Sequence, residues 1–115
     1  MMNVIPAIDK RLEDRRSLRV SATVTVSPTQ SFEVRTMDIS SGGMAICAPA
    51  NPRIGTQFDI SFQIPANPSG FSQVQVRVRV AYSVLSRDQD GFKIGLQFVR
   101  LSPDAATAIG RYIMH

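Results

Sequence analysis

Four valines at every second position, from Val74 to Val80, constrain the fold of this chain more than any other feature. The polar side chains that alternate with them are Gln73, Gln75, Arg77 and Arg79. Alternation of period two gives a β-strand one apolar and one polar face, whereas a helix would spread the valines around its circumference. The segment therefore predicts a long strand, which continues to about Leu85 before the turn at Asp88-Gln89-Asp90-Gly91.

Five further segments show strand patterns, separated by turns rich in Pro, Gly, Asn and Ser. They are residues 20–27, 32–39, 44–48, 58–64 and 92–98. After Ser102 and Pro103, apolar residues recur at helical spacing, which predicts one terminal helix with Ser102 as its N-cap. Six antiparallel strands expose two edges unless the sheet closes on itself. We therefore predict a mainly β domain, a six-stranded antiparallel barrel with a C-terminal helix.

The first 18 residues show neither the period of a strand nor that of a helix. Charges of both signs are interspersed along Lys10-Arg11-Leu12-Glu13-Asp14-Arg15-Arg16. We predict a flexible N-terminal arm over residues 1–18 and the barrel with its helix over residues 19–115. No internal repeat or linker divides the chain, and its 115 residues suit a single domain.

The basic residues are almost all arginine, with 11 Arg and 2 Lys in a chain of net charge +4. Arg grips phosphate with a planar fork and stacks on a base, so this bias favours a compact phosphorylated ligand over a long polyanion. A single-stranded nucleic-acid site along Arg35, Arg77 and Arg79 would also need aromatic side chains beside it. The phenylalanines of the predicted strands lie instead on apolar faces and are expected in the core: Phe32, Phe58, Phe62, Phe92 and Phe98. We therefore expect no binding to nucleic acid polymers.

Groups suited to catalysis or metal binding are sparse. The only histidine is the terminal His115 and the only cysteine is Cys47, which predicts neither a zinc site nor an intrachain disulfide. A phosphate-cleaving P-loop is also absent from the sequence. We expect no enzyme activity, metal or cofactor. No apolar run reaches the length of a membrane span or a signal-peptide core, which favours a cytoplasmic protein without membrane insertion.

One candidate ligand-binding cluster is Arg15-Arg16-Ser17-Leu18-Arg19, directly before the first strand of the predicted barrel. Its arginines at positions 15 and 19 lie four apart on the predicted arm. An arm of this kind can fold guanidinium groups over a ligand, hold its phosphates and stack on a purine. Taken alone, the cluster is more typical of a solvated flank beside a domain.

A second candidate is Asp38-Ile39-Ser40-Ser41-Gly42-Gly43, at a strand-to-strand turn. The Asp38 carboxylate can accept both donors of a guanine edge, N1–H and N2–H, and the Ser40 hydroxyl can donate and accept. Gly43 either leaves space for close approach or takes a backbone conformation closed to other residues. Taken alone, the turn is more typical of a structure in which Asp38 and Ser40 bond to nearby backbone.

Together the two clusters resemble the PilZ domain family, in which arginines four apart precede Asp-x-Ser-x-x-Gly at the first turn between strands of a barrel. The resemblance covers the chain from about Arg11 to the terminal helix. Further landmarks are Gly55 before the strand at 58–64 and the run Ile94-Gly95-Leu96-Gln97-Phe98. The family implies a bacterial receptor for cyclic di-GMP.

Carried onto this chain, the resemblance assigns a role to each candidate residue. Arg15 and Arg19 would hold phosphates and stack on guanine, with Arg16 as an additional contact. Asp38 and Ser40 would bind a guanine edge, and Gly43 would close the turn. The residues expected at the ligand are therefore Arg15, Arg16, Arg19, Asp38, Ser40 and Gly43.

The resemblance also implies that the arm orders on ligand binding and becomes a lid that signals to a downstream protein partner. Asp14 stands where family members that take the ligand as a stacked dimer often carry another Arg. This favours one cyclic di-GMP per domain, although Arg16 or Arg11 could supply the missing group. The alternative hypothesis is a PilZ-like protein-interaction module that does not bind nucleotide. The sequence leaves the partner and the oligomeric state open.

Overall fold

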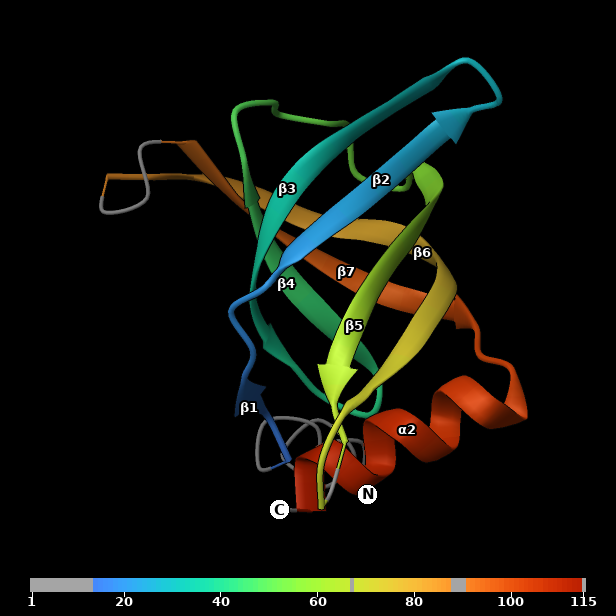
Figure 1. Ribbon diagram of the computed structural model, residues 1–115. Coiled ribbons are helices and arrows are strands. Elements are labelled where there is room, and N and C mark those ends of the chain that lie inside the picture. The colour runs from blue at the N-terminus through green and yellow to red at the C-terminus, as the bar shows by residue number, and fades with distance from the viewer. Residues whose placement is uncertain (1–13, 67, 88–90, 115) are drawn as a thin grey trace, which may run out of the picture.

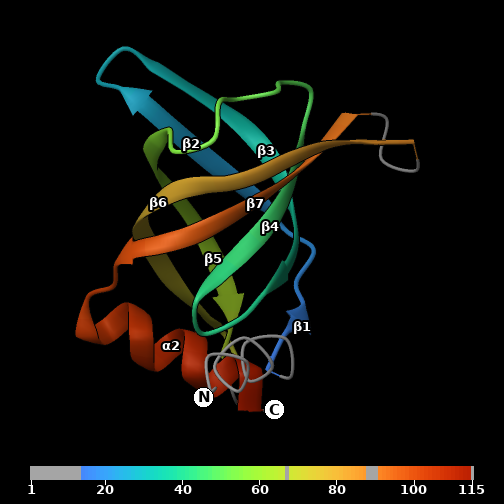
Figure 2. The same ribbon diagram turned by 180° about the vertical axis from the view of Figure 1, so that it is seen from behind.

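The strands of the computed structural model form one closed antiparallel sheet (Figures 1 and 2). The structure describes residues 14–66, 68–87 and 91–114. Its elements are β1 (Arg16–Ser17), β2 (Ser21–Ser27), β3 (Gln30–Ile39), β4 (Gly43–Ala48), β5 (Gln57–Pro65), β6 (Phe71–Ser86), β7 (Gly91–Arg100) and α2 (Pro103–Met114). The strand order is β1-β3-β2-β5-β6-β7-β4, and pairing of β3 with β4 closes the barrel. The predicted six-stranded barrel with a C-terminal helix is confirmed, because β2 to β7 form it and β1 adds only a short pair on β3.

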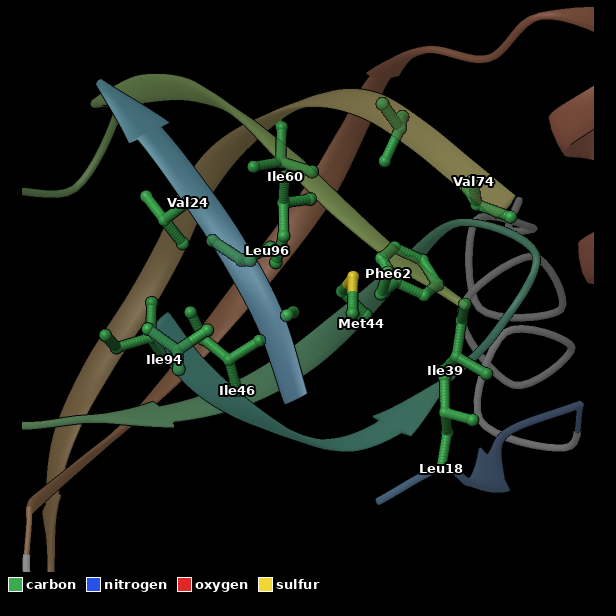
Figure 3. Packing of buried hydrophobic residues seen from close by; sticks show 14 of the residues in the cluster. Leu18, Val24, Ile39, Met44, Ile46, Ile60, Phe62, Val74, Ile94 and Leu96 are labelled. Carbon is green, nitrogen blue, oxygen red and sulfur yellow. The ribbon is translucent and has the colours of Figure 1, made fainter. Parts of the chain in front are cut away.

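The period-two pattern of β6 becomes one wall of the core. Its valines from Val74 to Val80 are at most 3% exposed. On the paired strand β5, Phe58, Ile60 and Phe62 lie opposite three of these valines and are also buried. Figure 3 shows how side chains from several strands meet inside the barrel. Because burying one such side chain contributes roughly 1.5–3 kcal/mol, the alternation stabilises the closed sheet strongly.

The terminal helix α2 covers one end of the barrel (Figure 1). The Ser102 hydroxyl accepts a hydrogen bond from the Ala105 backbone N–H at 3.1 Å, so Ser102 is the predicted N-cap. Ala105 and Ile109 are buried against the strands. No helix among the described residues is long and apolar enough to cross a membrane.

Two of the five phenylalanines expected in the core are fully buried there, Phe58 and Phe62. Phe92 and Phe98 pack against the core and are partly buried. The prediction for Phe32 is wrong, because its side chain is 47% exposed. The β2–β3 hairpin, on which Phe32 lies, projects beyond the barrel (Figure 1), so the apolar face of its tip has no opposite wall.

The last five residues of the predicted arm lie against the barrel, whereas residues 1–13 lie outside the described residues. β1 pairs antiparallel with the end of β3, with Arg16 opposite Ile39 and Ser17 opposite Asp38. Leu18 is 2% exposed and lies beside Ile39 in the core (Figure 3). In this structure the attachment to the barrel therefore begins before residue 19.

A single buried hydroxyl, that of Thr36, fixes the backbone on both sides of Arg19. It donates to the Leu18 carbonyl and accepts from the Val20 backbone N–H, the latter at 2.9 Å. The Thr36 N–H donates to the Val20 carbonyl at 2.9 Å. The chain therefore passes from β1 to β2 along a defined path, with the Arg19 side chain exposed.

Candidate functional site

A cavity of about 250 Å³ lies where the turn between β3 and β4 meets the middle of β6 and β7. Four of the six predicted ligand-binding residues are in its wall: Arg15, Asp38, Ser40 and Gly43. The turn lies at the same end of the barrel as β1 and α2 (Figure 2). The arginine cluster at residues 15–19 and the turn at residues 38–43, which the sequence linked only through a motif, therefore lie close together in space.

A β-bulge in β3 directs Asp38 into this pocket. The pairing of β3 with β4 shifts register between Thr36 and Asp38, which leaves Met37 as the additional residue. Thr36 is buried, and strict alternation would place Asp38 on the same inner face. With the bulge, Ile39 takes the core position at 0% exposure, and the Asp38 side chain lines the pocket with 20% of its surface exposed.

A second bulge, at Ala81 in β6, brings Tyr82 to the opposite wall. Val80 is buried, and the β6–β7 register shifts between Val80 and Tyr82, so that Tyr82 lies opposite Gly95. The Tyr82 ring covers Gly95 so closely that a Cβ at Gly95 would overlap the ring. Tyr82 was not among the predicted site residues, because the period-two alternation continues through it in the sequence. The available signal was Gly95, since a glycine inside a strand often marks close approach of another group.

The turn after Asp38 is held by its own hydrogen bonds. The Ser40 N–H donates to the Gly43 carbonyl at 2.8 Å, and the Ser40 hydroxyl bonds to the same carbonyl at 3.3 Å. That hydroxyl also accepts from the Gly42 N–H at 3.3 Å. Ser40 therefore shapes the turn, and its remaining acceptor position is the one that a ligand can use.

Close approach of β7 explains Gly43. A Cβ at this position would overlap the backbone carbonyl oxygen of Leu96. The glycines with positive φ in the described part of the chain are Gly55 and Gly70, so Gly43 is not required for a left-handed conformation. The sequence left open close approach or a special backbone conformation, and the structure places the backbone of β7 against Gly43.

Arg15 extends from the arm to the Asp38 carboxylate. Its Nε lies 3.9 Å from Asp38 Oδ1, a long ion pair in which the arginine side chain is 44% exposed. Exposed pairs of this kind contribute about 0–1 kcal/mol. A ligand that bonds to Asp38 and presents phosphate to Arg15 can therefore replace the contact at little cost.

Asp14, directly before Arg15, attaches the arm to the turn. Its Oδ2 accepts hydrogen bonds from the Ser41 hydroxyl at 2.6 Å and from the Ser41 backbone N–H at 3.4 Å. The carboxylate therefore lies between the two motifs. Arg15 is presented to the pocket from a segment that is anchored at Asp14.

The two remaining candidates, Arg16 and Arg19, are not in the pocket wall. The Arg16 guanidinium lies over the Tyr112 ring, with Cζ 4.2 Å from the ring centroid, and donates to the Tyr112 carbonyl. In this structure the Arg16 side chain is therefore directed to α2, and its contact with a ligand stays a prediction. Arg19 is exposed to solvent on a fixed backbone, and reaching the pocket depends on its long side chain.

The groups that line the pocket are suited to binding a polar ligand. They combine one cation, one carboxylate, hydroxyl groups and backbone amides with an aromatic ring. Within residues 14–66, 68–87 and 91–114, no group of three or more His, Cys, Asp or Glu could hold a metal ion. The fold and the site thus define a small β-barrel domain with a polar pocket at the turn between β3 and β4.

Comparison with known proteins names the family. A model of the PilZ domain matches residues 9–115, and the chain belongs to the PilZ domain family. The flagellar brake protein YcgR of Xanthomonas campestris pv. campestris is 31% identical over 119 residues, covering 89% of this chain and 44% of that protein. The chain therefore spans less than half the length of the curated relative that it matches.

Solved structures show the same fold at low sequence identity. The inhibitor of motility MotI/DgrA of Bacillus subtilis superposes with a TM-score of 0.76 at 15% identity, over 87% of this chain and 47% of that chain. The PilZ domain of YcgR from Escherichia coli, solved with c-di-GMP, gives a TM-score of 0.61 at 17% identity, over 87% of this chain and 86% of that chain. These similarities support the barrel and its terminal helix.

Proposed function

We propose that this domain is a receptor for cyclic di-GMP, with one guanine in the pocket and the phosphates held by the arginine arm. The observation that carries the proposal is the convergence of Arg15, Asp38, Ser40 and Gly43 on one cavity. Family membership supports it, as does the similarity in fold to a PilZ domain solved with c-di-GMP. A receptor role is also favoured over catalysis because the pocket offers groups that bind rather than a base and a nucleophile in contact.

Asp38 is the group that distinguishes guanine in this proposal. A carboxylate presents two acceptors side by side, which match N1–H and N2–H of guanine, whereas adenine has no such pair of donors. Because the side chain is only 20% exposed, its hydrogen bonds are partly shielded from water. The Tyr82 ring in the opposite wall offers an aromatic face for the same base.

The size of the pocket explains why the arm is needed. Its volume of about 250 Å³ is below the roughly 300–1,000 Å³ typical of pockets that enclose a small ligand. The pocket therefore accommodates part of a dinucleotide, and the rest must lie at the surface. Arg15 in the wall and Arg19 on the adjacent exposed segment are the groups that can reach phosphates there.

The test of this function is calorimetric titration with cyclic di-GMP. The wild-type protein is expected to bind, and Arg19→Ala is expected to bind about 10- to 100-fold more weakly, since a charge-assisted hydrogen bond contributes roughly 1.5–3 kcal/mol. Arg53→Ala is the matched control, because Arg53 is also an exposed arginine but lies between β4 and β5, outside both candidate motifs. Unchanged affinity in Arg19→Ala would remove Arg19 from the site. Absence of binding by the wild type would favour a protein-interaction module.

A second expected result concerns the arm. Amide hydrogen exchange of residues before Val20 should slow when cyclic di-GMP is added, because the arm orders over the ligand. The largest change is expected upstream of β1, since the Leu18 N–H already donates to the Met37 carbonyl at 3.1 Å. Amides of β6 provide the internal reference. Equal exchange of the arm with and without saturating ligand would contradict the lid.

A further inference from the structure

We propose that the last turn of α2 positions the arginine arm for its ligand, and that Tyr112 is the positioning residue. The inference rests on the proposed cyclic di-GMP binding and adds a group outside the pocket to it. Tyr112 does not line the cavity. It acts on Arg15 through the two residues of β1, Arg16 and Ser17.

Three contacts join Tyr112 to β1. The Tyr112 hydroxyl donates to the Ser17 carbonyl at 2.5 Å. The Arg16 guanidinium stacks on the Tyr112 ring with Cζ 4.2 Å from the centroid, and it also donates to the Tyr112 backbone carbonyl. Cations stabilise the last turn of a helix because its carbonyls are unpaired there and carry partial negative charge. One side chain at the end of α2 thus holds both residues of β1.

β1 needs this support because it is very short. It is a strand of two residues that pairs with the end of β3. A pair of this length gains little from its own hydrogen bonds, since fixing each backbone residue costs roughly 1–2 kcal/mol. On the core side, β1 is continued by the buried Leu18. On the solvent side, Tyr112 attaches β1 to α2.

The consequence concerns Arg15, which lies between two anchors. Before it, Asp14 is bonded to Ser41 of the motif turn. After it, Arg16 is held by α2. With both anchors formed, Arg15 is already in the pocket wall, 3.9 Å from Asp38. These two anchors therefore favour the arrangement of the arm that binds ligand, because a pre-organised arm loses less conformational entropy when the ligand arrives.

The same contacts couple the ligand to the helix. If Tyr112 stabilises the binding arrangement of the arm, a bound ligand must stabilise the attachment of Tyr112 to the same extent. The end of α2 is thereby the part of the fold, outside the pocket, on which ligand binding is expected to act. This coupling identifies α2 as a surface through which the domain can report that the ligand is bound.

The experiment compares cyclic di-GMP affinity and thermal stability in wild type, Tyr112→Phe, Tyr112→Ala and Met114→Ala. Tyr112→Phe keeps the ring under Arg16 and loses the bond to Ser17, and is expected to bind about fivefold more weakly. Tyr112→Ala loses the ring as well and is expected to bind about 30-fold more weakly. Met114→Ala should bind like the wild type, because Met114 is in the same turn but 85% exposed.

A coupling measurement separates positioning from a loss of stability alone. In the wild type, cyclic di-GMP should slow amide exchange of Ile113 and Met114, which lie outside the pocket wall. In Tyr112→Phe this slowing should be reduced, and in Tyr112→Ala it should be absent. If Tyr112→Ala does not fold, Tyr112→Phe and the exchange data decide the question.

The outcomes distinguish the inference from the function on which it rests. Wild-type affinity in both Tyr112 variants, or tighter binding by either, would overturn the positioning role and leave the receptor function intact. Exchange at the end of α2 that does not respond to ligand would overturn it as well. A wild type that does not bind cyclic di-GMP would overturn both the function and the positioning role.

Discussion

Asp38→Asn should weaken cyclic di-GMP binding by about 100-fold or more, while the barrel remains folded. The amide keeps the size of the side chain but has a single acceptor, and its NH₂ group would face a guanine donor. Loss of two charge-assisted hydrogen bonds at roughly 1.5–3 kcal/mol each corresponds to at least this factor. The protein should tolerate the change because the ion pair of Asp38 with Arg15 is long and partly exposed.

Calorimetry with two ligands and a control variant checks this result. The control is Asp59→Asn. Asp59 lies on β5, outside the pocket wall, and its carboxylate pairs with Arg77 of β6 at 3.3 Å. This substitution should leave the affinity for cyclic di-GMP unchanged. Cyclic di-AMP should not bind the wild type, since adenine lacks the donor pair that Asp38 accepts. Equal affinities of Asp38→Asn and wild type for cyclic di-GMP would show that another group binds the guanine edge.

Gly43→Ala is expected to be the most destabilising small substitution in the motif, lowering the free energy of unfolding by about 3 kcal/mol. The added methyl group would meet the carbonyl oxygen of Leu96, which is backbone of the paired strand β7. Relief requires the β4–β7 ladder to move apart, and such overpacking costs roughly 1–3 kcal/mol or more. Thermal unfolding should show a decrease in Tm of about 10 °C.

Substitution of a second glycine by alanine should have the opposite effect on the free energy of unfolding. Gly110 lies inside α2, and a Cβ there would meet no atom within 4 Å apart from the adjacent residues and the nearby backbone of the helix itself. Gly110→Ala should therefore stabilise the domain by up to about 1 kcal/mol, the difference in helix propensity between the two residues. If Gly43→Ala unfolds at the wild-type temperature, the strands can separate at this point, and Gly43 would be explained by the ligand instead.

Much of the fold was predictable because its signals are local. A strand that faces a core on one side must alternate apolar and polar side chains. Four valines at alternate positions of β6 show this pattern. The N-cap and first position of α2, Ser102 and Pro103, are equally local. Phe32 shows the limit of such signals. Its position in the alternation is correct for a core residue, but the hairpin extends past the barrel, so no strand covers it.

The candidate site was predictable only as a set of residue types. Asp38, Ser40 and Gly43 were found by motif, and the structure brings them together with Arg15. Tyr82 was not found, because its approach to Gly95 depends on the register of two strands. Arg16 was placed with the ligand, whereas a residue near the other end of the chain, Tyr112, determines where its side chain lies.

The sequence by itself determined the closed antiparallel barrel, the terminal helix and the two clusters that resemble a ligand-binding motif. These follow from period, turn residues and spacing along the chain. The tertiary structure decided which groups meet, through the bulges at Met37 and Ala81 that direct Asp38 and Tyr82 to the pocket. The physical reason is that one additional residue in a ladder reverses the faces of all residues that follow, and its position depends on the partner strand.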